Sequence, residues 1–179
     1  MALTSTIHSF TLQLADADRN VYVDLDLRVA RHPSETAEFM VARVLAYCLE
    51  YEEGIVFTDG VAAVDEPALL VRDLTGQIRA WIEVGAPDAT RLHRGAKRAD
   101  RAVVYAHRDV TPWLAQMSGE RIHRASEIPV HALDPAFLRE VGAAIQRRNQ
   151  ASLSVSGRVL YLDLNGQSYS SELRTCALG

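Results

Sequence analysis

The chain has 179 residues, of which 48% are hydrophobic, and its formal net charge is −4 at pH 7. This length and apolar content predict one well-packed domain, or a domain with an appended subdomain, and exclude wholesale disorder. The negative net charge excludes coating of nucleic acid by the whole surface, so any nucleic-acid binding has to use a local basic patch.

Targeting signals are not expected in this sequence. No run of about 18 apolar residues is present, so no membrane-spanning segment is predicted. The first residues lack a basic region followed by an apolar run, so no signal peptide is expected. Cys48 and Cys176 lie far apart and match no metal-binding spacing. Cys48 falls on the apolar face of a predicted helix, so it is expected to be a small core residue in a reducing cytoplasm.

The first predicted elements are a β-hairpin and a helix. Residues 5–14 and 21–29 alternate apolar and polar side chains around a turn-rich stretch, which predicts a hairpin with one buried face. A helix is then predicted from Pro33 to about Tyr51, because proline suits a first helical turn. Glu35 would lie in that first turn, where the helix dipole favours an anion.

A second hairpin and two further helices are predicted for the middle of the chain. A short strand at 55–57 precedes two apolar-rich runs, 68–72 and 77–85, that flank a glycine-containing turn. The later predicted elements are a helix from Pro87, a strand at 103–106, a helix at 110–118, a short strand at 121–123, a helix opened by Asp134 and Pro135, and a β-rich tail over 151–175.

These elements predict an α/β (α+β) architecture in one domain. Residues 30–148 would form a central α/β core with a mixed sheet flanked by helices. Residues 1–29 and 149–179 would form β-hairpin extensions that pack together as a second, antiparallel sheet.

The second hairpin is expected to bring acidic side chains together. In one register Glu66 lies opposite Glu83, and in another Ala68 does, with Glu66 one diagonal step away. Both registers leave Glu83 near Asp65 and Glu66. Two carboxylates about 4 Å apart repel by about 4 kcal/mol at an effective dielectric constant of about 20. A hard cation such as Mg²⁺ or Mn²⁺ would relieve this repulsion.

A strongly basic helix follows this hairpin. We expect its arginines to form one stripe, with Lys97 and His93 on the other flank; the predicted stripe is Arg91, Arg94, Arg98 and Arg101. A phosphodiester held there would meet cations and helix N–H groups on one side. On its other side it would meet a carboxylate-bound metal that activates water. The pattern is therefore typical of a nuclease.

Three motifs resemble those of the YaeQ family of bacterial proteins. They are Ala-Arg-His-Pro-Ser-Glu-Thr at 30–36, Asp-Glu-Pro at 65–67 and Trp-Ile-Glu-Val-Gly-Ala-Pro-Asp at 81–88. The resemblance covers essentially the whole chain. It implies a variant of the PD-(D/E)XK nuclease core, with the order helix, three strands, helix, strand.

The resemblance also implies roles for individual acidic residues. Glu83 takes the place of the acid on the third core strand, and Asp65 or Glu66 that of the acid before it. Glu35 resembles the acid that many such nucleases carry on the first helix. Together these four residues would hold Mg²⁺ or Mn²⁺.

The basic residues depart from the nuclease pattern. Gly85 stands where the pattern has a lysine, so Arg94 or Lys97 would have to replace it. An arginine can stabilise developing charge but cannot act as a base, because it does not deprotonate. Arg31, Arg91 and Arg94 would contact nucleic acid.

Three functions remain open on the sequence alone. The first is a metal-dependent nuclease, or another phosphodiester-processing enzyme, acting on DNA or RNA. The second is a nuclease fold that has lost catalysis and binds nucleic acid or a transcription or repair partner, as Gly85 suggests. The third is a structural or protein-interaction role, in which Glu83 pairs with Arg91 or Arg94, Glu35 serves only the helix dipole, and Asp65 and Glu66 are turn residues.

Overall fold

The structure is a computed structural model that describes residues 4–59 and 65–179. The strands are β1 (Thr6–Asp16), β2 (Val21–Arg31), β3 (Ile55–Phe57), β4 (Leu69–Arg72), β5 (Ile78–Val84), β6 (Arg101–Ala106), β7 (Pro129–Ala132), β8 (Arg148–Ser156), β9 (Val159–Leu164), β10 (Gln167–Glu172) and β11 (Arg174–Ala177). The helices are α1 (Ala37–Leu49), α2 (Ala89–Arg98), α3 (Thr111–Met117) and α4 (Pro135–Ala144), with a 3₁₀ turn at Ala125–Glu127.

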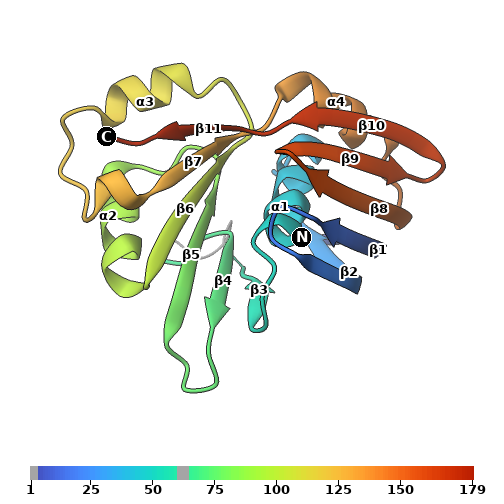
Figure 1. The fold of residues 1–179 in the computed structure, drawn as a ribbon, viewed down its shortest axis with the longest axis horizontal. Helices are drawn as coiled ribbons and strands as arrows, with labels where there is room; N and C mark the ends of the chain where they lie inside the picture. Colours follow the sequence, from blue (N-terminus) through green and yellow to red (C-terminus); the bar gives the residue numbers. More distant parts are fainter. Residues whose placement is uncertain (1–3, 60–64) are drawn as a thin grey trace.

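Two mixed sheets lie side by side, with α1 between them (Figure 1). The first has the strand order β10-β9-β8-β1-β2, and the second has the order β11-β7-β6-β5-β4-β3. The alternating sequences of β1 and β2 form the predicted hairpin, which pairs from Thr6 with Arg31 to Asp16 with Val21. The apolar side chains of this hairpin are buried on one face, as period-2 alternation requires.

The expectation of an antiparallel second sheet is wrong. Strands β1 and β8 run parallel, with Ser9 opposite Arg148, so this sheet is mixed. A parallel pair needs a long connection, and here the chain from β2 to α4, which includes strands β3 to β7 of the other sheet, supplies it. The tail is also divided: β8, β9 and β10 join this sheet, whereas β11 pairs with β7 in the other.

Helix α1 is buried on nearly all sides. Nine of its thirteen residues are buried, which is typical of a helix enclosed within a core. It begins at Ala37 rather than at the predicted Pro33, and the Thr36 hydroxyl caps it by accepting from the Phe39 N–H at 3.1 Å. The prediction failed because the Glu35 N–H donates to the His32 carbonyl at 2.9 Å, which forms a separate turn before the helix.

The second sheet has a parallel centre. Strands β5, β6 and β7 run parallel, and β6 is buried from Ala102 to Ala106. Helix α2 packs on this sheet, with Leu92 and Ala96 buried against it. The core between the sheets and α1 therefore lies on one face, and the α2 and α3 core on the other.

The predicted strand at 121–123 is absent, and its place in the sheet is taken by β7. Residues 121–123 belong to a loop in which the His123 N–H donates to His93 Nδ1 at 3.1 Å. That bond holds the backbone against α2 instead of against a strand. The actual strand begins with Pro129, and a strand tolerates proline best at its first residue.

The predicted stripe of four arginines is also wrong at one position. Ala99 has an extended backbone (φ −117°, ψ 159°) that ends α2, so Arg101 belongs to β6 instead of the helix. The Arg101 side chain donates to Glu50 at 2.6 Å and to Glu52 at 3.0 Å. It therefore ties β6 to the segment after α1 and is not on the basic face of α2.

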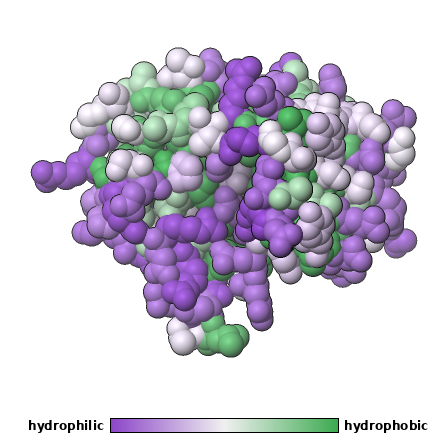
Figure 2. Space-filling view, viewed as in Figure 1, coloured by the Kyte–Doolittle hydropathy of each residue, from purple (hydrophilic) through white to green (hydrophobic). Residues whose placement is uncertain are grey.

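None of the helices in the described parts of the chain is both long and apolar enough to cross a bilayer. On the face shown in Figure 2, polar and apolar residues are interspersed, and an apolar spot stands apart at the tip of the β4–β5 hairpin. Leu74, in the turn between these strands, is fully exposed.

Gly95 lets α2 approach the second sheet closely. A Cβ atom at this position would lie 2.4–2.6 Å from the ring of Trp81, which is only 2% exposed and has no room to move. We expect Gly95→Ala to destabilise the protein by about 2 kcal/mol, because the overpacking outweighs the gain of about 1 kcal/mol in helix propensity. Chemical denaturation would measure this change. Lys97→Ala, at an exposed position of the same helix, should change stability by less than about 0.5 kcal/mol; equal effects would contradict the prediction.

Candidate functional site

A cavity of about 480 Å³ lies where the two sheets and two helix starts meet. Its wall comes from the end of β2, the start of α1, the segment after β3, the end of β5 and the start of α2. The charged side chains that line it are Glu35, Asp59, Glu83, Asp88, Arg43 and Arg91. Four carboxylates against two guanidinium groups leave a surplus of two negative charges among the described lining residues.

Glu83 is one of two buried acidic groups of this cavity. It lies on β5 and is 3% exposed. One carboxylate oxygen, Oε1, accepts from Trp81 Nε1 at 2.8 Å and from Arg91 Nε at 2.8 Å. Burial raises the pKa of Glu83, although the Arg91 bond and charge and the Trp81 bond lower it, and the Asp88 charge raises it slightly. The ion pair between Glu83 and Arg91, which the hypothesis of a structural role predicted, is present, but an open cavity lies beside it.

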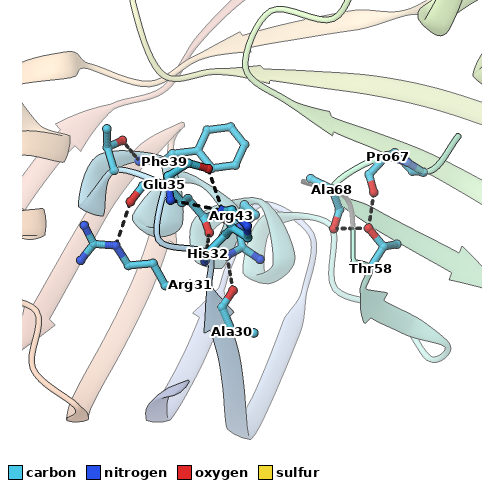
Figure 3. A network of polar contacts seen from close by, with 11 residues as sticks. Ala30, Arg31, His32, Glu35, Phe39, Arg43, Thr58, Pro67 and Ala68 are labelled. Atoms are coloured by element: carbon cyan, nitrogen blue, oxygen red, sulfur yellow. Dashed lines mark hydrogen bonds and ion pairs between the residues drawn. The ribbon is translucent and has the colours of Figure 1, made fainter. Parts of the chain in front are cut away.

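Glu35 forms the second buried pair, shown in Figure 3. Arg43 Nε donates to Glu35 Oε1 at 2.6 Å, and the His32 N–H donates to Oε2 at 3.0 Å. Arg43 also donates to the Ala30 carbonyl at 2.8 Å. Glu35 is therefore not simply a first-turn partner of the helix dipole, because it precedes the helix and holds an arginine two turns along it.

Asp65 and Glu66 do not join Glu83 in the cavity as predicted. The strands pair Leu69 with Ile82, and a bulge shifts the register between Val71 and Arg72. Continued by one residue, this register puts Ala68 opposite Glu83, so the alternative with Glu66 opposite is wrong. The Asp65 side chain, largely exposed, pairs with Arg94, and the Glu66 carbonyl accepts from Arg91. Neither acid lines the cavity.

Three further predicted site residues, Arg31, Arg94 and Lys97, also lie outside the cavity lining. Arg94 and Lys97 are exposed on α2. Arg31 is half-buried, and its Nε donates to the Glu35 carbonyl at 3.0 Å. Of the predicted residues, the cavity therefore gathers Glu35, Glu83 and Arg91.

Three charged lining residues were not predicted as site residues. Asp88 caps α2, where its Oδ1 accepts from the Arg91 N–H at 2.7 Å. Its position before a helix after Pro87 is the signal that could have drawn attention to it. Arg43, a charged residue in an otherwise apolar helix sequence, was a second such signal. Asp59 carries no such signal.

Gly85 has a backbone conformation that lysine rarely adopts. Its φ is +107°, and a Cβ there would lie 3.4 Å from the Phe39 ring and 3.7 Å from His107. A left-handed φ of this kind favours glycine. The backbone at position 85 therefore disfavours not only the lysine of the nuclease pattern but any residue with a side chain.

The acidic side chains of the site do not form a complete metal-binding site by themselves. Within residues 4–59 and 65–179, no three His, Cys, Asp or Glu side chains gather closely enough to hold a metal ion. This arrangement is unlike a structural zinc site, which needs four protein ligands. Mg²⁺, by contrast, is usually held by one or two carboxylates together with waters and substrate phosphates.

The raised pKa of Glu83 gives a stability prediction with a definite sign. Folding raises the pKa of Glu83, so the ionised form of this side chain opposes folding. The contribution of Glu83 to the free energy of unfolding is therefore fully present below the ordinary glutamate pKa. It is lost as the pH rises through the pKa of Glu83 in the folded protein. We expect Glu83→Gln to gain stability relative to the native chain as the pH rises from acid to neutral, by on the order of 1 kcal/mol. Thermal or denaturant unfolding across this pH range would measure the change.

The matched control is Glu140→Gln, because Glu140 is exposed on α4 and forms no hydrogen bond or ion pair with the described residues. Its stability difference should stay flat across the same range. A Glu83→Gln difference that is also flat, or that falls with pH, would contradict the assigned effect of burial.

A family model described as YaeQ protein matches residues 1–173. The chain is 34% identical over 164 residues to the "Uncharacterized protein YaeQ" of Escherichia coli (strain K12) and 32% identical to that of Salmonella typhi, covering 90% of each chain. It resembles the crystal structures of YaeQ proteins from Xanthomonas axonopodis pv. citri (TM-score 0.89, 30% identity, 96% of this chain and 98% of that one) and Pseudomonas syringae (0.86, 30%, 98% of both). The chain therefore belongs to the YaeQ family.

Proposed function

We propose that the cavity is a divalent-cation-dependent site that processes phosphodiesters of nucleic acid. In this proposal the second sheet with α1 and α2 is a variant of the PD-(D/E)XK nuclease core. The observation that carries it is the convergence of two buried glutamates, from separate elements, on one open cavity whose described lining has two surplus negative charges. Buried acids beside an open cavity are typical of functional sites.

The donor chemistry of the cavity fits Mg²⁺ or Mn²⁺. The surplus carboxylates are hard oxygen donors, and one divalent cation balances two negative charges. Glu83 and Asp88 would hold the ion, because the Asp88 charge acts on the pKa of Glu83 and both line the cavity. Bound there, the ion would supply a water of lowered pKa as nucleophile.

The arginines of the cavity supply the positive charge that a phosphodiester needs. Arg91 contacts Glu83, so its guanidinium stands beside the group that would hold the cation. Arg43 is held against Glu35 and shapes the opposite wall. Arginine binds phosphate through paired N–H groups and stabilises the charge that develops during phosphoryl transfer, without acting as a base.

Binding without cleavage is the second candidate, and the backbone at Gly85 favours it. The nuclease pattern needs a lysine on this strand, and a φ of +107° disfavours one. The exposed positions of Arg94 and Lys97 offer no replacement at the cavity wall. On this reading the same cavity retains a nucleic-acid backbone and does not cut it.

The nuclease proposal predicts cleavage that depends on both the cation and Glu83. Incubation with plasmid, single-stranded DNA and RNA should give products in Mg²⁺ or Mn²⁺ and none in chelator. Glu83→Gln should lower the rate by about 10²-fold or more, because it removes the ligand charge. Glu140→Gln should cut at the native rate.

Three outcomes separate the candidates. Cation-dependent cleavage that is lost in Glu83→Gln supports the enzyme. Binding of oligonucleotide in chelator, weakened by Arg91→Gln and without any cleavage, supports the binding module and overturns the enzyme. Neither cleavage nor binding would overturn both.

A further inference from the structure

We propose that a groove lined by Arg28, Arg147 and Arg148 binds the phosphodiester backbone of a single nucleic-acid strand and leads it toward the cavity. We call it the arginine groove; its lining also includes Ile7 and Ser9, and its volume is about 440 Å³. It lies on the exposed face of the first sheet, on strands that contribute neither Glu83 nor Asp88. This inference rests on the proposed function, because it names the substrate class of that site.

The strand register gathers the three arginines around one serine. Ser9 on β1 pairs with Arg28 on β2 and with Arg148 on β8. Arg28 and Arg148 therefore flank Ser9 on neighbouring strands, about 10 Å apart across two strand spacings. The Ser9 N–H and hydroxyl both donate to the Arg147 carbonyl, at 2.9 and 3.4 Å, which fixes the third arginine beside them.

These arginines differ from those that serve the fold. Arg43, Arg91 and Arg101 each hold a buried or half-buried carboxylate. Arg28 and Arg148 are exposed, and neither their side chains nor that of Arg147 makes an ion pair or hydrogen bond with the described residues. Like charges on neighbouring strands oppose sheet formation, so this cluster weakens the isolated protein and is positioned to meet an external anion.

The arginine groove and the cavity adjoin each other at one strand pair. Ile7 pairs with Ala30; Ile7 lines the arginine groove and Ala30 lines the cavity. On the side of the groove away from the cavity the sheet carries negative charge. Asp26 lies two residues from Arg28 on the same face, and Asp24 lies beyond it. A polyanion held by the arginines is therefore repelled along the sheet in that direction. On the cavity side the uncharged pair Ile7 and Ala30 adjoins the cavity, where the proposed cation would offset the surplus negative charge.

The chemistry of the groove favours a phosphate backbone over an acidic protein. Arginine and serine hydroxyl groups are typical phosphate contacts. Protein interfaces instead need an apolar core with aromatic residues, and the apolar contribution here is Ile7, 41% exposed.

The test measures binding in chelator, where no cation-dependent cleavage occurs. A fluorescent single-stranded oligonucleotide would be titrated by anisotropy at several salt concentrations. The triple variant Arg28→Gln, Arg147→Gln and Arg148→Gln should bind at least about tenfold more weakly at 0.1 M salt. The slope of log K against log salt should fall by about 2, because each lost phosphate contact on a single strand removes about 0.7.

The matched control carries the same charge change elsewhere. Arg121→Gln, Arg139→Gln and Arg174→Gln replace three exposed arginines whose side chains make no ion pair or hydrogen bond with the described residues. It should bind with nearly native affinity, and thermal unfolding should show both triple variants folded. Equal losses in the two variants would mean a general effect of charge and would overturn the inference.

The remaining outcomes keep this inference apart from the proposed function. Cleavage by the native chain with unchanged binding by the groove variant overturns the groove and leaves the cavity standing. Groove-dependent binding without any cation-dependent cleavage supports the groove while the enzymatic proposal fails. Polyglutamate that displaces the oligonucleotide at equal charge concentration would identify an acidic protein segment as the occupant and overturn the inference.

Discussion

The buried ion pair between Arg43 and Glu35 fixes how the central helix meets the first hairpin. Their side chains are 6% and 1% exposed, so both charges have left water, which costs several kcal/mol for each ion. The pair is tolerated because the remaining positions are satisfied: the His32 N–H donates to the carboxylate, and Arg43 donates to the Ala30 carbonyl. Loss of either partner would leave an uncompensated buried charge, so the pair locks β2, the turn after it and α1 into one geometry.

The same principle recurs on the other side of the cavity. Glu83 accepts from Trp81 within its own strand and from Arg91 on the following helix, so β5 and α2 are joined as β2 and α1 are. Two sheets thus present acids whose positions are fixed by packing before any ligand arrives. Preorganisation of this kind is what a polar site needs in order to act without rearrangement.

Local patterns in the sequence predicted local structure well. Alternation in residues 5–14 and 21–29 predicted the first hairpin, and Asp134 caps α4 as expected, with its side chain accepting from the Ala136 N–H. Non-local features were harder. The bulge between Val71 and Arg72 shifts the acids relative to one another, and no residue pattern marks it.

The candidate site was predicted only in part for the same reason. Glu35 and Glu83 stood out as acids within predicted elements, and both line the cavity. Asp65 and Glu66 stood out equally, but their places depend on the path of the chain before β4 and on the strand register. The arginine groove could not be read from sequence, because Arg28 and Arg148 are brought together only by the pairing of β1 with β8.

The parallel pairing of β1 with β8 also governs when this chain can finish folding. Ser9 on β1 can pair with Arg148 on β8 only after β8 has been synthesised, so the first sheet stays incomplete until most of the chain is present. At about 5–20 residues per second, that delay lasts on the order of 10 s. During this time the β1 edge of the β1–β2 hairpin lacks its partner strand β8, and exposed strand edges of this kind promote aggregation. The nascent chain is therefore expected to depend on chaperones more than its small size suggests.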